Sequence, residues 1–370
     1  MICWLRPNIP RNFSDLAELP YFRWTFEKTC GIVWLTTKTS ERTGDIMKEK
    51  VLLLLKEGEY ISGEKLSEIL GVSRTAIWKA INSLRDDGYE IDSVTNKGYK
   101  LVKKPNVLNA STISEGLNVK VVGTEIITLK TVDSTNEEIK RKAHENARSG
   151  LVVISCEQTA GKGRLGRKWA SNEGGVYFSF LLRPELPPSD VSGITLAAGL
   201  GVCLAIRKFT GLDAKIKWPN DVVVSHKKIC GILTEMGLED GKIREVVIGV
   251  GINVNLAEIQ EELKDKATSL YLETGKTYDR NLLIGLVMGK FEKNYEKFVQ
   301  TCDLSLMIDD YNMMLANKCQ PVRILDKLDP YEGVALGIDR EGELLVRVAD
   351  GRIRKECSGE VSVRGLYSYV

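Results

Sequence analysis

The sequence predicts an α+β protein of three successive domains, on three observations. Residues 46–105 place apolar side chains at helical spacing and then alternate as a short hairpin does. Residues 106–317 mix long helical segments with apolar runs of strand length, and residues 318–370 consist of short strand-like segments separated by turns. Residues 1–45 contain no clear period, so we treat them as an N-terminal extension of unknown role.

This extension contains three tryptophans but fits no known pattern. Our hypothesis is that it is foreign to the working protein and arises from an upstream start that is read through. The alternative is a short accessory segment. Mass spectrometry of the protein from its native source would decide, because an N-terminus at Met1 contradicts the hypothesis.

Composition excludes several classes of protein. With 43% hydrophobic and 28% charged residues, the 370-residue chain has the composition of a soluble globular protein. A net charge of +2 creates no global field, so any contact with DNA needs a local basic patch. The longest apolar run, residues 196–206, is shorter than the ~20 residues needed to cross a bilayer, and the N-terminus lacks the apolar core of a signal peptide. We therefore expect a cytoplasmic protein without membrane contact.

Eight cysteines and two histidines are scattered along the chain. They form no C-x-x-C pair and no histidine has zinc-finger spacing, which argues against a zinc site or a disulfide framework. We expect small buried thiols in a reducing compartment, and we expect His144 and His226 to be surface or satisfied histidines rather than catalysts.

The first domain shows the pattern of a winged helix-turn-helix. Ser62 and Ser73 are placed as helix N-caps and Gly88 as a C-terminal stop. The second and third helices are joined only by residues 71–73, and a hairpin with a turn at residues 96–98 follows. The apolar sets expected to face inward are Val51, Leu52, Leu54 and Leu55; Leu66, Ile69 and Leu70; and Ile77, Ile81 and Leu84.

The helix expected at residues 74–87 would read operator DNA, because its N-terminal side chains are placed to reach base edges in the major groove. Residues 46–104 contain eleven cations and nine acids, so we expect DNA binding to need a dimer, which doubles the phosphate contacts. The alternative is a winged helix kept for protein contacts or regulation. The candidate DNA-binding residues are Ser73, Arg74, Thr75, Trp78 and Lys79.

The middle domain is expected to be a mixed, largely antiparallel α+β domain, because several connections have hairpin length. Its expected strands are residues 119–122, 126–129, 151–155, 176–182, 216–217, 222–224, 229–236 and 246–254. Its expected helices are residues 135–145, 189–209 and 280–298. The last domain has expected strands at residues 322–325, 332–338, 344–348 and 352–357, which is typical of a small β-barrel.

A glycine-rich basic loop at residues 157–169 is the most informative chemical feature. It alternates four cations with three glycines: Lys162, Arg164, Arg167 and Lys168 with Gly161, Gly163 and Gly166. Glycines let a backbone approach a ligand closely, and Lys and Arg supply donors that match phosphate or carboxylate oxygens. We therefore predict an anion clamp, and the alternative is an ordinary solvated basic loop. The loop also fits G-x-G-x-x-G, but a turn and a strand follow it where a dinucleotide fold needs a helix, so that fold is excluded. A P-loop is excluded too, since no G-K-[ST] follows.

A second motif, Lys217-Trp218-Pro219-Asn220-Asp221, lies between an alternating apolar stretch and a valine-rich strand. We expect it to form a bend between two strands. An ordinary turn is the alternative, because Pro fixes φ and Asn or Asp bonds its own backbone. A turn seldom needs a Trp and a Lys as well, which favours a functional bend.

Two more motifs complete the pattern, Asp133-Ser134-Thr135-Asn136 upstream and Gly249-Val250-Gly251-Ile252-Asn253 downstream. With these four motifs in order, the chain from about Met47 to its end resembles the biotin-protein ligases, and specifically the bifunctional kind that is also the biotin operon repressor. The resemblance implies a biotin/lipoate-ligase-like catalytic domain at residues 106–317 and an SH3-like barrel at residues 318–370.

The resemblance also implies a two-step reaction with biotin, ATP and Mg²⁺. Biotin and ATP give biotinyl-5′-AMP and pyrophosphate, and the acyl group then passes to a lysine of a biotin carboxyl carrier protein of the acetyl-CoA carboxylase type. The first step joins two anions, so cations must neutralise the charge between them. Lys217 is expected to bridge the carboxylate and the α-phosphate, while Lys162 and Arg164 hold the acyl phosphate. These three residues are the candidate catalytic groups, and no residue is assigned to the metal.

Further site residues are implied motif by motif. The implied biotin-binding residues are Ser134, Thr135, Asn136, Gln158, Lys162, Gly163, Arg164, Lys217, Gly231 and Gly249. The implied nucleotide-binding residues are Arg164, Arg167, Trp169, Asn220, Gly251 and Asn253, with Trp169 closing over the intermediate. A Ser-Thr-Asn cluster supplies the donors and acceptors that a ureido ring needs, although D-S-T-N before a helix is also an N-cap sequence.

Two consequences concern the clamp. Lys162 stands where many family members carry Arg, and a Lys keeps the charge but loses the bidentate fork, which puts the affinity for the adenylate in doubt. Ordering about ten glycine-rich residues costs on the order of 10 kcal/mol, so we expect the loop to be mobile until adenylate binds. If the loop borders the dimer interface, as in the family, biotinyl-AMP would drive formation of the homodimer that binds the operator.

Two rival functions remain open at this point. A lipoate or octanoyl ligase would share the catalytic fold but lacks the K-W-P-N-D bend and normally the winged helix. A transcription factor whose ligase site has decayed would keep the ligand sensor alone. The intact Lys217, Arg164 and Gln158 argue against decay.

Overall fold

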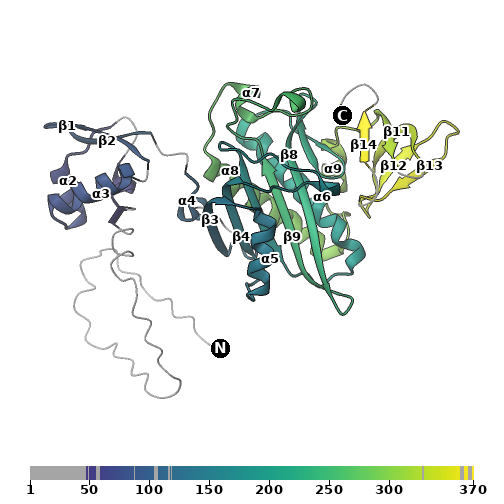
Figure 1. The fold of residues 1–370 in the computed structure, drawn as a ribbon, viewed down its shortest axis with the longest axis horizontal. Helices are drawn as coiled ribbons and strands as arrows, with labels where there is room; N and C mark the ends of the chain where they lie inside the picture. Colours follow the sequence, from purple (N-terminus) through teal and green to yellow (C-terminus); the bar gives the residue numbers. More distant parts are fainter. Residues whose placement is uncertain are drawn as a thin grey trace, which may run out of the picture. The chain divides into compact units, whose positions relative to one another are not determined.

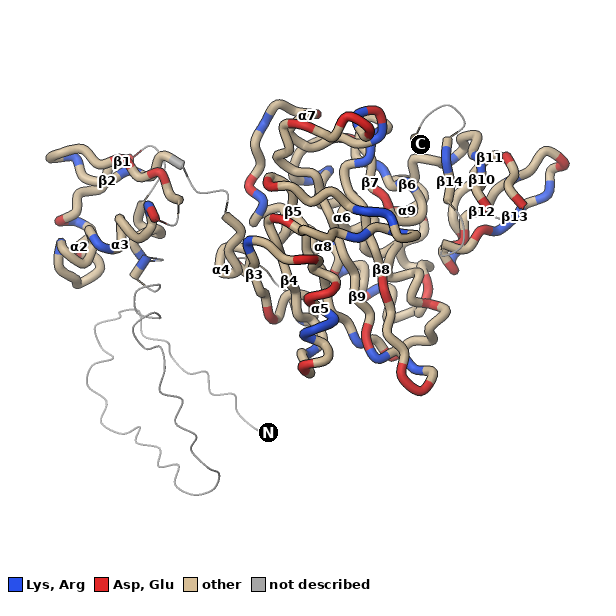
Figure 2. Tube along the Cα trace, in the orientation of Figure 1, with Lys and Arg blue, Asp and Glu red and all other residues tan. Residues whose placement is uncertain are grey.

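The computed structural model describes residues 47–48, 50–55, 59–86, 88–103, 107–115, 117, 119–326, 329–358, 362–365 and 369–370. The hypothesis about residues 1–45 lies outside the described residues. The chain divides into two compact units, Met1–Lys104 and Pro105–Val370 (Figure 1). In both units the Lys and Arg residues are interspersed with Asp and Glu (Figure 2).

The first unit confirms the winged helix-turn-helix. Residues 47, 48 and 50–54 are helical, and four named elements follow: α2 (Gly63–Leu70), α3 (Arg74–Asp86), β1 (Glu90–Val94) and β2 (Gly98–Lys103). Ser62 caps α2 by accepting from Lys65 N at 3.0 Å, and Ser73 caps α3 by accepting from Ala76 N at 3.2 Å. Gly71 ends α2 in the left-handed conformation, which makes the short connection possible.

The core of this unit is formed by one face of each helix and by the inner face of the antiparallel β1–β2 hairpin, where Ile91 pairs with Leu101. Leu66, Ile77 and Ile81 are buried as expected. The expectation for Ile69 is wrong, because its side chain is 50% exposed. The short α2 has room for only one fully buried position, and Leu66 occupies it.

The second unit is built on a seven-stranded sheet in the order β3-β4-β5-β9-β8-β7-β6. Only β3 and β4 pair in parallel, so the expected mixed, largely antiparallel sheet is confirmed. Its strands are β3 (Glu125–Val132), β4 (Leu151–Gln158), β5 (Val176–Leu182), β6 (Lys215–Lys217), β7 (Asp221–Val224), β8 (Lys227–Glu239) and β9 (Lys242–Ile252).

Helices cover both faces of this sheet because alternate residues of the central strands are buried on each side. On β4, Val153 packs toward α5 (Thr135–His144), whereas Val152 and Ile154 pack toward the two long helices α6 (Val191–Thr210) and α8 (Arg280–Thr301). The second unit also contains three short helices: α4 (Ala110–Ser114), α7 (Leu270–Thr274) and α9 (Ile308–Met314).

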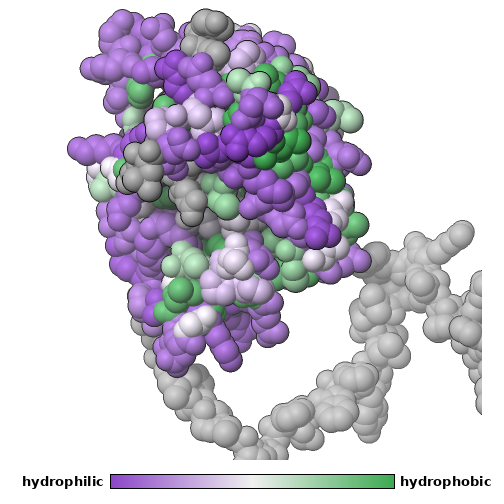
Figure 3. Space-filling model, turned by 90° about the vertical axis from the view of Figure 1, so that its right-hand side faces the viewer, coloured by the Kyte–Doolittle hydropathy of each residue, from purple (hydrophilic) through white to green (hydrophobic). Residues whose placement is uncertain are grey.

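The C-terminal segment forms a five-stranded antiparallel sheet in the order β13-β12-β11-β10-β14. Its strands are β10 (Pro321–Leu325), β11 (Tyr331–Ile338), β12 (Leu344–Arg347), β13 (Ile353–Glu356) and β14 (Ser362–Gly365), the last of which the sequence did not reveal. The surface seen from the right-hand side of Figure 1 is mainly hydrophilic, with local groups of apolar side chains (Figure 3). Closure into an SH3-like barrel stays a prediction.

Three expectations about single segments need comment. The expected strand at residues 119–122 is wrong: these residues form a bend and turn tied to the Glu292 carboxylate, which accepts from Val122 N at 2.8 Å. The expectation of buried thiols holds for Cys203 and Cys230 but is wrong for residues 302, 319 and 357, which are exposed. Both histidines are exposed, as expected.

Among the described residues, one helical stretch, Pro188–Thr210, is long and apolar enough to span a membrane by composition, and 72% of its apolar window is buried inside the protein.

Candidate active site

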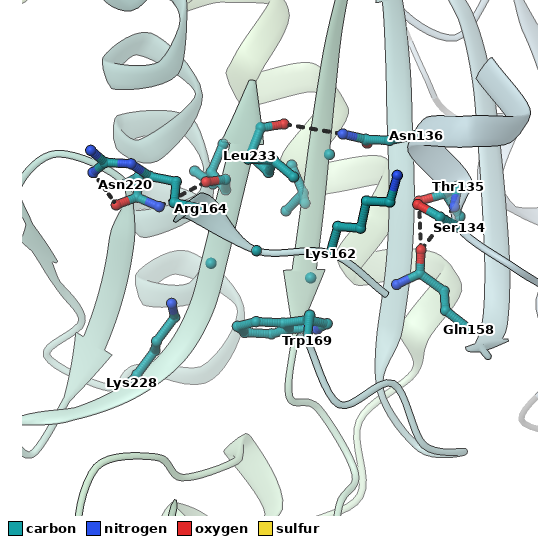
Figure 4. Close-up of a pocket in the computed structure, with 16 residues that line it drawn as sticks. Ser134, Thr135, Asn136, Gln158, Lys162, Arg164, Trp169, Asn220, Lys228 and Leu233 are labelled. Atoms are coloured by element: carbon teal, nitrogen blue, oxygen red, sulfur yellow. Dashed lines mark hydrogen bonds between the residues drawn. The ribbon is translucent and has the colours of Figure 1, made fainter. Parts of the chain in front are cut away.

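A polar pocket opens where α5 begins, where β4 ends and where β8 and β9 run side by side (Figure 4). Ser134, Thr135 and Asn136 at the start of α5 line it together with Gln158 from the end of β4. The floor needs glycine at residue 249, because a Cβ there would lie 2.2 Å from Asn136 Oδ1. The structure therefore brings the predicted biotin-binding cluster together.

Hydrogen bonds fix the side chains of this cluster. Gln158 Oε1 accepts from the Thr135 backbone N–H at 2.8 Å, and Gln158 Nε2 donates to Ser171 Oγ at 2.8 Å. Ser134 occupies the N-cap position of α5, yet its hydroxyl makes no capping hydrogen bond. A capping hydrogen bond from Ser134 therefore does not hold the start of this helix, and D-S-T-N is not simply an N-cap sequence here.

The glycine-rich loop folds over the pocket as a compact turn. Gly163 N donates to Arg167 O at 2.7 Å, and Trp169 N donates to Gly161 O at 2.9 Å. The glycines open only a three-residue 3-10 turn at residues 164–166, so the loop lacks the helix of a dinucleotide fold. Lys162 and Arg164 both line the pocket. We call residues 161–168 the clamp loop.

Two contacts anchor the cations of the clamp loop. Lys162 Nζ lies 2.7 Å from Glu137 Oε1 on α5, and the Lys162 side chain is 52% exposed. Arg164 Nη1 donates to Asn220 Oδ1 at 3.2 Å, which ties the loop to the K-W-P-N-D bend. That bend lies between β6 and β7 as expected, with a cis peptide bond between Trp218 and Pro219.

A second, charged pocket adjoins the first and shares Arg164, Trp169 and Asn220 with it. Lys217 lines this pocket but not the polar one, so the structure separates it from the biotin-binding cluster. Its ammonium group lies 4.0 Å from Asp221 Oδ2 and 4.2 Å above the Tyr369 ring. Burial lowers the pKa of Lys217 to about 8, although Asp221 acts in the opposite direction.

Asp221 is the carboxylate at the centre of the charged pocket. Its Oδ1 pairs with Lys228 Nζ at 2.5 Å, and its Oδ2 accepts from Tyr369 Oη at 2.5 Å. Burial raises the pKa of Asp221, but Lys228 and Lys217 outweigh burial and hold that pKa below its ordinary value. Asp221 is therefore ionised at neutral pH.

The Trp169 indole lies between the pockets and packs flat on β8 and β9. A Cβ at Gly251 would come 2.5 Å from Trp169 Nε1, so only glycine leaves room for this ring. Lys228 Nζ lies 5.0 Å above the ring, and Trp169 Nε1 is buried without a hydrogen-bond partner among the described residues. A third pocket on the far side of the indole is lined by Arg167 and Asn253.

Five residues near these pockets were not expected from the sequence: Ser179, Lys228, Glu235, Arg364 and Tyr369. Lys228 lines all three pockets and could have been suspected, because it lies seven residues after Asp221 on the strand paired with β7. Nothing local in the sequence marks the others, since each is brought in by tertiary packing.

In the first unit, the candidate DNA-binding residues all lie on the exposed side of α3 and of the turn before it. The Trp78 side chain is 54% exposed, which is unusual for a tryptophan. Arg74 Nη2 pairs with Glu64 Oε2 of α2 at 3.0 Å. Ser73 uses its hydroxyl as the cap of α3.

Three family models match the chain: the Biotin/lipoate A/B protein ligase family at residues 128–253, an HTH domain at residues 47–100 and the Biotin protein ligase C terminal domain at residues 320–364. The Bacillus subtilis bifunctional ligase/repressor BirA is 40% identical over 324 residues, covering 86% of this chain and 98% of that protein. The chain belongs to the bifunctional biotin ligase/repressor family.

Other members agree. The Escherichia coli bifunctional ligase/repressor BirA is 34% identical over 316 residues, covering 85% of this chain and 96% of that protein. The structure of an Aquifex aeolicus biotin protein ligase in complex with biotin and ATP has a TM-score of 0.58 and 36% identity, and covers 65% of this chain and 99% of that one. The expected family and fold are confirmed, and the rival reading as a lipoate or octanoyl ligase is not supported.

Proposed function

We propose that this protein is an ATP-dependent, AMP-forming biotin-protein ligase that also represses biotin genes by binding operator DNA. One observation carries the ligase function: the polar pocket adjoins a pocket whose lining includes six cations, among them Arg164, Lys217 and Lys228. The first pocket supplies the hydrogen-bond donors and acceptors that a ureido ring needs. The second supplies the positive charge that is needed to join a carboxylate to a phosphate. The exposed face of α3 supports the repressor function.

In the first step, a biotin carboxylate oxygen bonds to the α-phosphorus of ATP and pyrophosphate leaves. Arg164 borders both pockets and is placed to hold the carboxylate. Lys217 and Lys228 lie on either side of Asp221 and neutralise the phosphate charge. The Trp169 N–H has no hydrogen-bond partner among the described residues and is a donor for the bound intermediate. The pocket lined by Arg167 and Asn253 binds the nucleotide.

In the second step, the ε-amine of the carrier lysine attacks the acyl carbon, AMP leaves and the amine loses a proton. Asp221 is the one acidic residue among those lining the charged pocket. With its lowered pKa it is a weak base, so its role is to attract and orient the incoming amine rather than to hold the proton.

Mg²⁺ would enter with ATP. Where it is bound by one or two carboxylates, its remaining ligands are water and substrate phosphates. The described residues contain no group of three or more Asp, Glu, His or Cys side chains that could hold a metal ion. The phosphates of ATP therefore supply most of its ligands in this proposal.

Regulation follows from the same intermediate. Biotinyl-AMP held under the clamp loop would favour a homodimer, and the dimer would bind the operator, because two α3 helices double the phosphate contacts of a unit with little net charge. The carrier protein and a second copy of the chain would then compete for the loaded enzyme.

One experiment tests both activities. The purified protein is given biotin and MgATP, and retention of biotinyl-AMP, biotin labelling of a carrier domain and a gel shift with operator DNA are measured. We expect all three, with the gel shift dependent on biotin and ATP together. DNA binding controlled by biotin without any labelling would identify a sensor whose ligase site has decayed.

A further inference from the structure

Glu235 of β8 lies behind the polar pocket and is not one of the residues that line it. Its Oε2 accepts from Asn136 Nδ2 at 2.7 Å, and its Oε1 pairs with Lys140 Nζ of α5 at 2.6 Å. Both side chains are about 30% exposed, at 31% for Lys140 and 28% for Glu235. A carboxylate and an ammonium group at this distance form an ion pair.

An ionised carboxylate can only accept hydrogen bonds, and this fixes the Asn136 amide. The Asn136 NH₂ group must point toward Glu235, so Oδ1 points the other way, where it accepts from Ser179 Oγ at 2.6 Å. Ser179 is fully buried on β5. Asn136 therefore presents its acceptor to Ser179. Its NH₂ group also lies 3.5 Å from Leu233 O, a contact too long to fix the amide by itself.

The same order continues through the rest of the cluster. Ser179 Oγ lies 2.7 Å from Thr135 Oγ1, and Thr135 contacts Gln158 Oε1 through its backbone N–H and its hydroxyl (Figure 4). Gln158 is thereby turned so that its NH₂ group faces Ser171. Because Ser179 gives its one proton to Asn136, Thr135 must donate its own to Ser179, which leaves the Thr135 oxygen as an acceptor for the pocket. Gln158 is fixed separately by the Thr135 backbone N–H, and Glu235 is the only charged group in the series from Thr135 to Glu235.

We propose that Glu235 is a positioning residue that fixes the hydrogen-bond polarity of the polar pocket, and so determines its selectivity for a cyclic urea head over an isosteric head with reversed donors and acceptors. This inference rests on the proposed function, since biotin is the ligand with that head. Ser179 transmits the polarity from Asn136 to Thr135. Glu235 contacts no ligand itself.

The test compares the wild type with Glu235→Gln, which keeps the size of the side chain but can either donate to or accept from Asn136. Dissociation constants are measured calorimetrically for biotin, for dethiobiotin and for the cyclic carbonate analogue of biotin, whose ring carries two oxygen atoms in place of the two urea N–H groups. We expect biotin to bind roughly tenfold more weakly to the variant, the size of effect that one mispaired buried hydrogen bond produces. The ratio of the carbonate to the biotin dissociation constant should fall, because both orientations of Asn136 become populated and Thr135 can then donate to the pocket as well as accept.

Two controls separate polarity from packing. Dethiobiotin has the same urea head as biotin, so its ratio to biotin should not change in Glu235→Gln. Lys140→Met breaks the ion pair but leaves the Glu235 carboxylate as an acceptor for Asn136, so its selectivity should match that of the wild type. Equal loss of selectivity in Lys140→Met would show that the ion pair acts only through stability, and would overturn the proposal.

A polarity exchange provides a second variant. Asn136→Asp alone places two carboxylates together and should bind biotin worst. Combined with Glu235→Gln, the new carboxylate again presents a fixed acceptor to Ser179, and selectivity against the carbonate should recover. Failure to recover, or wild-type selectivity in Glu235→Gln alone, contradicts the positioning role. A wild-type protein that binds no biotin would instead contradict the proposed function.

Discussion

Lys217 illustrates how a single side chain depends on its surroundings. It is only 6% exposed, and burial together with nearby cations leaves its pKa at about 8. Asp221 at 4.0 Å compensates part of this charge. An anion in the charged pocket would raise the pKa again, because it favours the protonated ammonium form.

Proton uptake should therefore accompany nucleotide binding. With a pKa of about 8, roughly half of the Lys217 side chains are neutral at pH 8 in the free protein, and phosphate binding protonates them. We expect an uptake of about half a proton at pH 8 and much less at pH 6.5, where Lys217 is already charged. Calorimetry in buffers of different ionisation enthalpy measures this number, and Lys217→Met should abolish its pH dependence.

Replacement of Lys217 by Gln should slow adenylate formation by about 10²- to 10³-fold, the usual effect of removing one group that stabilises developing charge. Pyrophosphate release measures this step. Lys215→Gln on the same strand is the matched control, since Lys215 lies outside the pockets and pairs with Asp213. Near-normal release from Lys217→Gln would remove this residue from the mechanism.

At the residue scale, the sequence predicted the groups that lie within contiguous motifs. The clamp cations were found because glycine spacing and residue type are local signals, whereas the Ser134–Asn136 cluster and Gln158 were assigned from the resemblance to the family's motifs. Glu235 and Ser179 have no such signal, because a Glu or Ser within an alternating strand usually faces solvent. Their role appears only when α5 packs on the sheet.

At the scale of elements, the clamp loop is unusual because it carries Lys162 where many family members carry Arg. Lys162 is bound to Glu137 in the described structure, whereas a guanidinium group at that position could bind an acyl phosphate with two parallel hydrogen bonds. We expect Lys162→Arg to slow the dissociation of biotinyl-AMP roughly 3- to 10-fold. Stopped-flow fluorescence gives the rate, and Glu137→Gln serves as a companion that frees Lys162 without changing it. An unchanged rate in both variants would show that this cation does not contact the adenylate.

The α3 helix offers a sharper test through its ion pair with α2. Arg74→Ala should cost ~1 to 3 kcal/mol in operator binding if Arg74 contacts a base. Glu64→Gln also breaks the 3.0 Å pair but keeps the cation, so it should leave binding unchanged or improve it. Gel-shift titrations in the presence of biotinyl-AMP compare the two variants. Equally weakened operator binding in both would show that Arg74 acts through its ion pair with Glu64 and not through a contact with DNA.

Element boundaries were predicted best where two signals coincide. The β5 strand was predicted at its observed bounds because an apolar run lies between turn residues. The short helices α4, α7 and α9 were missed, since five to seven residues are too few to show a helical period. Residues 119–122 have strand-like composition, yet the buried Glu292 carboxylate binds their N–H groups and holds them in a turn.

At the scale of the whole molecule, the two proposed activities lie in separate compact units. Every residue that lines the polar or the charged pocket belongs to the second unit. Deletion of residues 1–104 should therefore abolish operator binding and leave substantial ligase activity. Carrier labelling and gel shifts on the same preparation measure both. A folded truncated protein without ligase activity would contradict this separation.

The contacts of the C-terminal sheet have a consequence for synthesis of the protein. Asp221 is hydrogen-bonded to Tyr369, and Trp218 Nε1 donates to Gly342 O at 3.1 Å, so residues made at very different times meet in one place. Among the described residues, the core of the first unit draws on residues 47–101, and this core can form early during translation. On the ribosome, the DNA-binding unit can thus be complete while the ligase pocket still lacks one wall, and acquisition of that wall waits for the last residues to emerge.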